Sequence, residues 1–307
     1  MTNNLISIII PTYNRRSLLP ETLDSIAKQT YTNFECLVID DRSTDETKDY
    51  LITYSQKDPR FKYFLRFEDK PKGANVCRNI GLDMAKGDYI VFFDSDDVMT
   101  PDHLEVKIHG LQSNRCDFVI TKTKYFNFDD GNLSLDVNYT FKTKDISLYN
   151  YVSQTINWLT LDIAIVSHIA KQCRFNELLS SGQEYNYFSK ILTKTTNGVI
   201  LDNIVSLRRY HQESIQSKLR KDKNKMTLSY FIVYWNTYRD IKKQATYDVR
   251  KNLVYKCYRS FKKYDTALEL TYIKPLTWAL IKIFGIKGLY YALDVFVNNL
   301  RRSAYAS

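Results

Sequence analysis

The first 125 residues alternate between apolar runs of strand length and longer segments with helical periodicity. Residues 5–10 form a β-branched run that ends at Pro11, and four similar runs follow: "FECLVID", residues 61–65, residues 89–93 and "DFVITKTKYF". Between them lie segments such as "SLLPETLDSIAKQTY", in which apolar residues return every three or four positions. This alternation predicts an α/β fold, with a mostly parallel sheet that is flanked by helices on both faces.

Polar motifs follow three of the predicted strands. "PTYNR" comes after the first strand, "DDRSTD" after the second and "DSDD" after the fourth. In open α/β sheets, ligands bind at the carboxyl ends of the strands. We therefore expect the three motifs to meet at one edge of the sheet and to form the functional site there.

The "DSDD" motif suggests a bound cation. Asp94, Asp96 and Asp97 directly follow an apolar strand, and their mutual repulsion and lost hydration cost free energy unless positive charge is near. Mg²⁺ and Mn²⁺ prefer oxygen ligands and use one or two protein carboxylates together with phosphate oxygens and water. The motif therefore predicts such a metal site. The alternative is a polar turn before a helix that starts at Thr100-Pro101.

Taken in order, the motifs resemble a known family. The stretches "ISIIIPTYNRRSLLPETLDSIAKQTYTNFECLVIDDRSTDET" and "GANVCRNIGLDMAKGDYIVFFDSDD" are similar to the family-2 glycosyltransferases with the GT-A fold, which is Rossmann-like. The resemblance spans roughly residues 5–112. It implies transfer of a sugar, with inversion, from a nucleotide-diphosphate donor in the presence of Mg²⁺ or Mn²⁺.

The resemblance also implies a role for each motif residue. Asp41 would hydrogen-bond the base, usually uracil, and Arg78 would lie near the phosphates or sugar of the donor. Asp94 would contact the ribose or donor sugar, with Ser95 beside it in the donor site, and Asp96 would bind the metal that bridges the two phosphates. The nucleotide pocket would be lined by the residues after the first strand, which are Pro11, Thr12, Tyr13 and Arg15.

The general base is expected in "SSGQEYNYFSKIL". The family commonly has an acidic pair here, and its second acid deprotonates the acceptor hydroxyl; in this chain the pair reads Gln183-Glu184, so Glu184 takes that role. The alternative is an acid that only stabilises a helix N-terminus. Asp162 in "WLTLDIAI" is a reserve candidate. "RRYHQESIQ" resembles a later family stretch in which a histidine approaches the metal, which points to His211.

The C-terminal part differs in character from the rest. We divide the chain into a GT-A domain at 1–214, with a donor half at 1–112 and an acceptor and catalytic half at 113–214, and a basic helical region at 215–307. The helical spacing of two apolar stripes predicts packing between helices: Leu228, Phe231, Tyr234, Trp235 and Tyr238, and later Leu289, Leu293 and Phe296. Lys and Arg beside an amphipathic helix also fit an anionic membrane surface.

These observations predict a metal-dependent, inverting hexosyltransferase. Its donor is a nucleotide sugar, with UDP expected, and its acceptor is a hydroxyl of a glycan or of a lipid-linked molecule, in the synthesis of cell-surface polysaccharide. Five cysteines without a C-x-x-C pair and an N-terminus unlike a signal peptide indicate the cytoplasm, with peripheral attachment to the inner face of the membrane.

Three alternative functions explain fewer of these motifs. A catalytically inactive GT-A scaffold would explain the change to Gln183-Glu184. Asp94 to Val98 also fits D-x-D-x-V, the signature of phosphatases with an aspartate nucleophile, but that motif usually closes the first strand of its fold. The net charge of +10 favours anionic partners. Nucleic acid is nevertheless disfavoured, because carboxylates at the strand ends would repel its phosphates.

Overall fold

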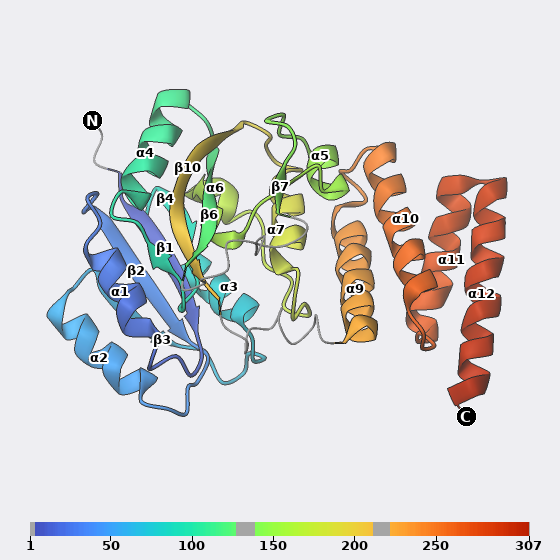
Figure 1. Cartoon of the computed structure of the whole chain (residues 1–307), viewed down its shortest axis with the longest axis horizontal. Coiled ribbons are helices and arrows are strands. Elements are labelled where there is room, and N and C mark those ends of the chain that lie inside the picture. Colours follow the sequence, from blue (N-terminus) through green and yellow to red (C-terminus); the bar gives the residue numbers. More distant parts are fainter. Residues whose placement is uncertain (1–3, 127–138, 211–221, 307) are drawn as a thin grey trace. The chain divides into compact units, whose positions relative to one another are not determined.

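The computed structural model describes residues 4–126, 139–210 and 222–306 (Figure 1). Contacts along the chain divide it into two compact units. The first unit comprises residues 1–146, 154–180 and 194–210, and the second comprises residues 147–153, 181–193 and 211–307. The second unit therefore joins two short segments from the middle of the chain to the C-terminal helices.

An eight-stranded sheet forms the centre of the first unit. Its order is β3-β2-β1-β4-β9-β6-β10-β5. Strands β3, β2, β1 and β4 run parallel, β9 runs antiparallel to β4 and β6, and β10 is parallel to β6. The strands are β1 (Ile6–Thr12), β2 (Phe34–Asp40), β3 (Phe61–Leu65), β4 (Tyr89–Phe92), β5 (Val98–Met99), β6 (Phe118–Phe126), β9 (Ile163–Val166) and β10 (Gly198–Arg209).

This arrangement confirms the predicted α/β fold with a mostly parallel sheet. The helices of the unit are α1 (Leu19–Ala27), α2 (Thr47–Lys57), α3 (Ala74–Met84), α4 (His103–Asn114) and the short α6 (Ser167–Ala170). A short 3-10 turn, η1 (Thr160–Asp162), precedes β9, and the two-residue strands β7 (Thr140–Phe141) and β8 (Ile156–Asn157) pair separately. Since β9 is antiparallel to both β4 and β6, these two strands run in the same direction as each other. The strands β1, β2, β4, β6 and β10 therefore all point the same way, and their carboxyl ends share one edge.

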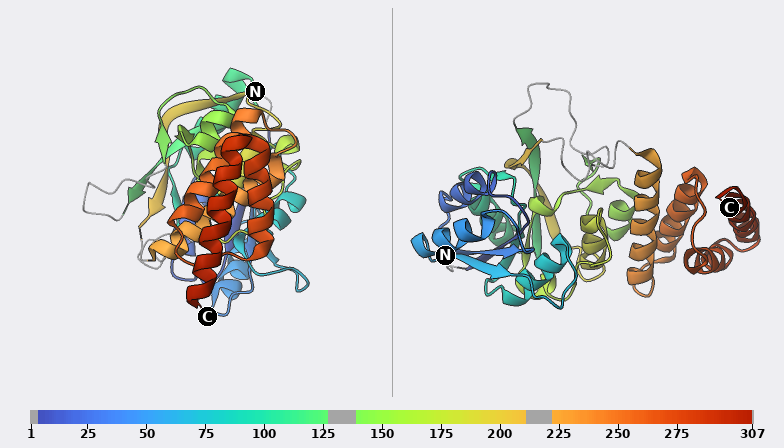
Figure 2. Two further views of the ribbon diagram at one scale, coloured as in Figure 1. Left: turned by 90° about the vertical axis from the view of Figure 1, so that its right-hand side faces the viewer. Right: turned by 90° about the horizontal axis from the view of Figure 1, so that it is seen from below.

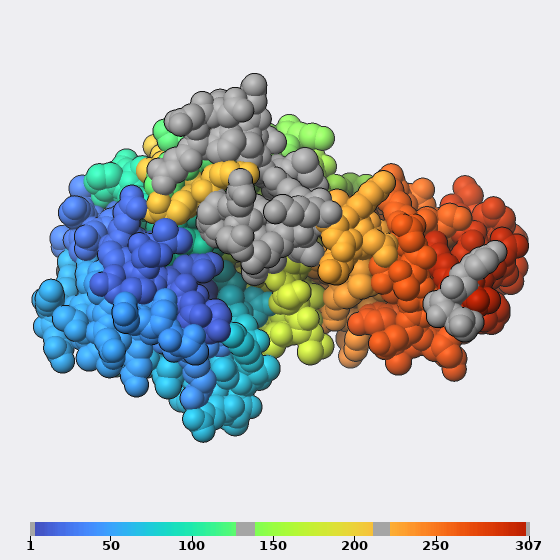
Figure 3. Space-filling view, turned by 60° about the horizontal axis from the view of Figure 1, so that its bottom comes forward, coloured from blue at the N-terminus to red at the C-terminus, as the bar shows by residue number. Residues whose placement is uncertain are grey.

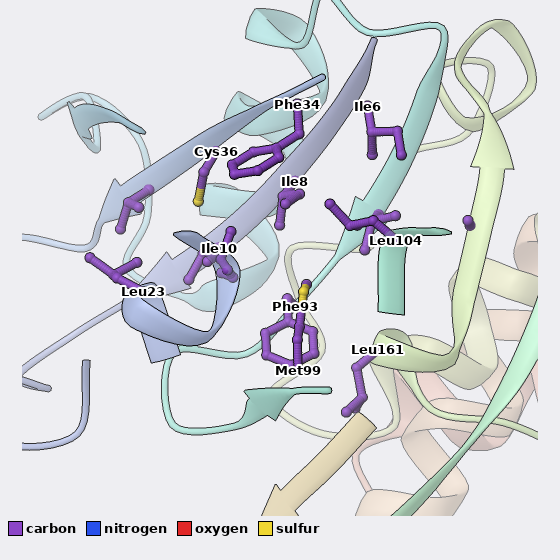
Figure 4. Packing of buried hydrophobic residues seen from close by; sticks show 14 of the residues in the cluster. Ile6, Ile8, Ile10, Leu23, Phe34, Cys36, Phe93, Met99, Leu104 and Leu161 are labelled. Carbon is purple, nitrogen blue, oxygen red and sulfur yellow. The ribbon is translucent and has the colours of Figure 1, made fainter. Parts of the chain in front are cut away.

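Strand β1 shows how the pattern of side chains builds the core. Successive side chains of a strand point to opposite faces. Ile8 and Ile10 pack in one cluster with Leu23 of α1 and Cys36 of β2 (Figure 4). Ile9 points to the other face, where α3 comes so close that a Cβ on Gly81 would lie 2.3 Å from Ile9 Cγ2.

Two boundaries differ from those expected. Strand β1 does not end at Pro11, because Pro11 and Thr12 remain in register with Ile39 and Asp40 of β2. The helix expected from Thr100-Pro101 begins at His103, after Pro101. The first polar motif is therefore carried two residues further along the sheet than the apolar run suggests.

The second unit consists of helices. These are α5 (Leu148–Ser153), α7 (Gln183–Ile191), α9 (Lys223–Ile241), α10 (Tyr247–Lys263), α11 (Leu270–Phe284) and α12 (Ile286–Ala306). Helix α10 packs against α9 and α11, and α11 lies beside α12 (Figure 2). Figure 3 shows the surface of these C-terminal helices in orange and red. Within the described ranges, no helix is long and apolar enough to cross a membrane.

The two predicted packing stripes differ in their exposure to solvent. The α9 stripe is largely buried, as expected, at Phe231, Tyr234, Trp235 and Tyr238. The α12 stripe is exposed: Leu289, Leu293 and Phe296 belong to a face that also presents Ile286, Tyr290, Val297 and Leu300 to solvent. The prediction that the α12 stripe packs between helices is therefore wrong for the chain as described, since helical periodicity does not show whether a partner covers a face.

Candidate functional site

The loop after β1 and the loop after β2 form one wall at the shared sheet edge. Asn14 adopts a positive φ of 50°, which asparagine tolerates better than most residues. Its backbone N–H donates to Ser43 Oγ at 2.9 Å, and its side-chain oxygen accepts from the Thr44 N–H at 2.8 Å. The backbone N–H of Arg15 donates to Thr47 Oγ1 at 3.1 Å. Two of the three polar motifs are thus held together by hydrogen bonds.

The predicted nucleotide pocket begins at the end of β1. Pro11 and Thr12 are buried, and within the described residues the Thr12 hydroxyl oxygen is buried without a hydrogen-bond partner. Tyr13 is exposed, and the ammonium of Lys72 lies 3.4 Å from the centre of its ring. An aromatic face, a cation and an unused hydroxyl are the kinds of groups that bind a nucleotide.

Asp41 has a buried ionic partner that the sequence analysis did not find. Arg66 Nε donates to Asp41 Oδ1, and both side chains are buried. The same guanidinium also donates to the carbonyl of Phe67 at 3.1 Å and to the carbonyl of Lys70. Arg66 directly follows β3, so the search for polar residues at strand ends could have included it. The pair fixes Asp41, the residue expected to bind the base.

The acidic motif after β4 contains carboxylates in three environments. The Asp94 side chain is 30% exposed and accepts from Arg78 Nη2 at 2.7 Å, and that of Asp96 is 18% exposed with Arg15 Nε 3.4 Å from its Oδ2. Asp97 is 2% exposed. Burial, followed by the charges of Asp96 and Asp94, raises the pKa of Asp97 well above its ordinary value. Asp94 and Asp96 are therefore the acids open to a ligand.

Arg209 at the end of β10 supports the acidic motif from the other side. Its backbone N–H donates to Asp97 Oδ1 at 2.9 Å, and its Nε donates to the Asp96 carbonyl at 3.0 Å. Nη2 of the same guanidinium forms an ion pair with the carboxylate of Glu21 in α1. Ser95 belongs to the same framework, because its carbonyl accepts from the Thr22 hydroxyl at 3.2 Å. Sequence analysis missed Arg209, which lies 112 and 113 residues from its two partners in the motif.

Arg78 connects α3 to the acidic motif. Its side chain is 3% exposed, and its guanidinium carbon lies 5.5 Å from the centre of the Phe175 ring. Its Nε is buried and has no hydrogen-bond acceptor among the described residues. A guanidinium nitrogen in that position favours an acceptor from outside the chain, such as a phosphate oxygen.

The fit of a metal depends on the two open carboxylates. Among the described residues, no group of three or more His, Cys, Asp and Glu side chains forms a complete metal cage. Mg²⁺ and Mn²⁺ do not need one when they arrive with a diphosphate, because phosphate and water oxygens fill most of the shell. Asp96 and Asp94 supply oxygen ligands of the right chemical type. His211 lies outside the described residues.

The two candidate bases have different surroundings. Glu184 is half-buried in the first turn of α7, after Gly182, whose φ is 61°. A carboxylate in a first turn is stabilised by the helix dipole, so this placement alone does not identify a base. It belongs to the second unit, and its role as the base stays a prediction.

Asp162, the reserve candidate, is fully buried in the first unit. Its carboxylate accepts from the Thr123 hydroxyl at 2.5 Å and from the Leu159 N–H at 2.7 Å. Burial raises the pKa of Asp162 to about 6 and lowers the pKa of the neighbouring Lys107 to about 7. This burial and these bonds assign Asp162 to the core rather than to an acceptor site.

The sequence model of glycosyl transferase family 2 matches residues 7–176, which cover the sheet edge and its polar loops. The chain belongs to this family. An uncharacterized glycosyltransferase of Rickettsia conorii is 38% identical over 130 residues. The match takes up 42% of this chain and only 20% of that relative's length.

Solved structures show the family fold. TarS 1-349 of S. aureus superposes with a TM-score of 0.69 at 18% identity, over 98% of this chain and 91% of that one. TarS 1-349 in complex with UDP-GlcNAc has a TM-score of 0.63 at 18% identity, over the same shares of both chains. The mannosyltransferase PcManGT of Pyrobaculum calidifontis, in complex with GDP-Man and Mn²⁺, has a TM-score of 0.58 at 17% identity. The match covers 96% of this chain and 86% of that one. These likenesses confirm the predicted GT-A fold.

The buried pair of Asp41 and Arg66 leads to a stability prediction. Replacing Arg66 by Met leaves the Asp41 carboxylate buried without its counter-charge, so we expect the free energy of unfolding to fall by about 3 kcal/mol. Urea unfolding followed by circular dichroism measures this loss. The matched control is Lys122→Met, which breaks a pair with the exposed Asp202 and should change stability little. Equal losses in both variants would contradict the assignment.

Proposed function

We propose that this chain transfers a sugar from a nucleotide-diphosphate donor, with UDP as the expected nucleotide, to a hydroxyl group of a glycan or lipid-linked acceptor. The observation that carries the proposal is the meeting of open carboxylates and guanidinium groups at one sheet edge. Asp94, Asp96, Arg78 and Arg15 come from three separate segments and are joined by ion pairs. Such a mixed cluster suits a diphosphate that arrives with a divalent cation.

Each donor-site residue has a distinct task in this proposal. The wall made by the loops after β1 and β2 holds the base and ribose, with Asp41 fixed by Arg66 and Tyr13 at the surface. Asp96, with Asp94 beside it, would hold Mn²⁺ or Mg²⁺, which neutralises charge on the diphosphate when bound. Arg78 offers its free Nε to the diphosphate as negative charge develops there.

The transfer itself is proposed to be a single displacement with inversion. Glu184 accepts the proton of the acceptor hydroxyl, whose oxygen forms a bond to the anomeric carbon as the bond to the diphosphate breaks. No covalent intermediate on the enzyme is needed. The rival from another class is an inactive GT-A scaffold, suggested by Gln183-Glu184 in place of the usual acidic pair. The phosphatase alternative is dropped, since the chain belongs to glycosyl transferase family 2.

We propose synthesis of cell-surface polysaccharide, at the cytoplasmic side of the membrane, as the setting of this reaction. The exposed apolar face of α12 supports peripheral attachment. It presents Leu293, which is 63% exposed, together with its apolar neighbours, and the helix carries Lys287 and Arg301 for anionic headgroups.

The donor site is tested by calorimetry with UDP in the presence and absence of Mn²⁺. Asp96→Ala removes an open carboxylate, so we expect the Mn²⁺-dependent part of the affinity to fall about tenfold or more. The control is Asp83→Ala, an exposed acid of the same unit that pairs with Arg174. UDP binding that ignores Mn²⁺, or that survives Asp96→Ala unchanged, would overturn the site assignment.

The base is tested by separating binding from transfer. Glu184→Gln keeps size and polarity but cannot accept a proton, so we expect UDP binding to persist and sugar transfer to fall at least about a hundredfold. A panel of nucleotide sugars provides the donor for the assay, and Glu105→Gln, at an exposed acid of α4, is the control. Full turnover by Glu184→Gln would eliminate Glu184 as the base. No transfer by the unaltered chain with any donor would favour the scaffold.

Membrane attachment is tested by flotation of the full chain with lipid vesicles. We expect it to float with phosphatidylglycerol vesicles and much less with phosphatidylcholine vesicles. Leu293→Glu should reduce flotation, because it places a charge on the apolar face of α12. Leu178→Glu, at an exposed leucine of the first unit, is the matched control. Absence of flotation with either lipid would refute the attachment.

A further inference from the structure

A cavity of about 700 Å³ lies among α9, α10 and α11 of the second unit. Its volume falls within the range of roughly 300 to 1,000 Å³ that is usual for ligand pockets. No carboxylate lines it, whereas five cationic side chains do: Arg239, Lys242, Lys243, Arg250 and Lys282. In the part of this unit that the structure describes, the ion pairs are made by Lys190, Lys225 and Lys262 and by none of these five. The cavity therefore carries uncompensated positive charge.

Helix dipoles explain part of this charge but not Arg250. The other four cations lie at or near the carboxyl ends of α9 and α11, where the dipole favours positive charge. Arg250 lies near the amino end of α10, where the dipole disfavours a cation. Its Nε is buried and has no hydrogen-bond partner among the described residues. Such a group costs free energy unless an acceptor reaches it, so it points to an anionic ligand.

Aromatic side chains form much of the remaining wall. Trp235 and Tyr238 are buried and lie 5.5 Å apart between ring centres, while Trp278 is 69% exposed at the rim. Tyr247 also lines the cavity, and its hydroxyl donates to the Ile283 carbonyl at 2.7 Å, which ties the start of α10 to the end of α11. These flat apolar faces suit the C–H faces of sugar rings.

A proline interrupts the hydrogen bonding of helix α11 at the wall of the same cavity. Pro275 lies inside this helix and has no N–H, so it cannot donate to the carbonyl of Thr271 one turn earlier. Both residues line the cavity. The α11 wall of the cavity is therefore a place where the helix lacks one internal hydrogen bond.

We propose that this cavity binds an anionic glycan, a chain of sugar units that carry phosphate or carboxylate groups, and that this glycan is the acceptor. The cations bind its charged groups, and the aromatic faces pack against its rings. The assignment of the glycan as acceptor rests on the proposed sugar-transfer function.

Two other anionic partners fit these features less well. A membrane surface contacts exposed faces, and in this unit the exposed apolar stripe lies on α12 rather than in the cavity. Single-stranded nucleic acid also combines phosphate with stacking rings, but its usual site is an open groove that tracks the backbone. This cavity is instead a partly open pocket with the buried Trp235 in its wall and the exposed Trp278 at its rim, which favours a short glycan segment, and nucleic acid becomes one arm of the test.

The test uses calorimetry on the full chain without nucleotide. The probes are hexagalacturonate, which has rings and charge; maltohexaose, which has rings alone; polyphosphate, which has charge alone; and a thymidine hexanucleotide. We expect hexagalacturonate to bind at least about tenfold more tightly than each of the other three. Binding no tighter than that of maltohexaose, or tighter binding of the hexanucleotide, would overturn the proposal.

Two variants locate the site, and one control accompanies them. Arg250→Gln and Trp278→Leu should each weaken hexagalacturonate binding about tenfold, and Trp278 is exposed enough that its replacement should not disturb folding. Lys263→Gln removes an exposed cation from the same α10 outside the cavity and should leave the affinity unchanged. Unchanged affinity in both cavity variants would place the glycan elsewhere and refute the site.

The outcome is separable from that of the proposed function. UDP binding depends on Asp96 in the first unit, so both cavity variants should retain it, and Asp96→Ala should retain hexagalacturonate binding. Loss of Mn²⁺-dependent UDP binding with intact glycan binding would sink the sugar-transfer proposal alone. Intact UDP binding without hexagalacturonate binding would sink the cavity proposal alone. Leu293→Glu should leave glycan binding unchanged, which separates the cavity from membrane attachment.

Discussion

The acidic motif after β4 can exist only because positive charge is brought to it from other segments. Arg15 comes from the loop after β1, Arg78 from α3 and Arg208 from β10. Without them, neighbouring carboxylates at the end of a buried strand would repel one another and lose hydration. The strands β1, β4 and β10 run in the same direction, which places these segments at one edge of the sheet. The charge balance of the site therefore depends on the sheet topology.

The graded exposure of the three carboxylates gives the motif its chemical character. Asp97 is buried and its pKa is raised, so it serves mainly to hold the backbone of Arg209. Asp94 and Asp96 remain open, each beside a guanidinium that a diphosphate could share. A donor that arrives with a cation would therefore enter a site whose charges are already arranged, with little cost of reorganisation.

The helical unit presents two surfaces of different chemistry. One is a concave, cationic and aromatic cavity among α9, α10 and α11, and the other is the exposed apolar face of α12. Neither surface belongs to the sheet that carries the proposed donor site. A glycosyltransferase with an anionic acceptor close to a membrane would have use for both, and the two can be altered independently by Arg250→Gln and Leu293→Glu.

Over the first 125 residues, sequence alone determined the alternation of strands and helices and the residue types at the strand ends. Periods of 2 and 3.6 residues are local signals, and the polar motifs stand next to the runs that place them. Tertiary structure alone decided the partners of the acidic motif, such as the backbone N–H of Arg209 that donates to Asp97 across 112 residues, and the exposure of Leu293 on α12. The physical reason is that burial and charge pairing depend on neighbours in space, which no local pattern records.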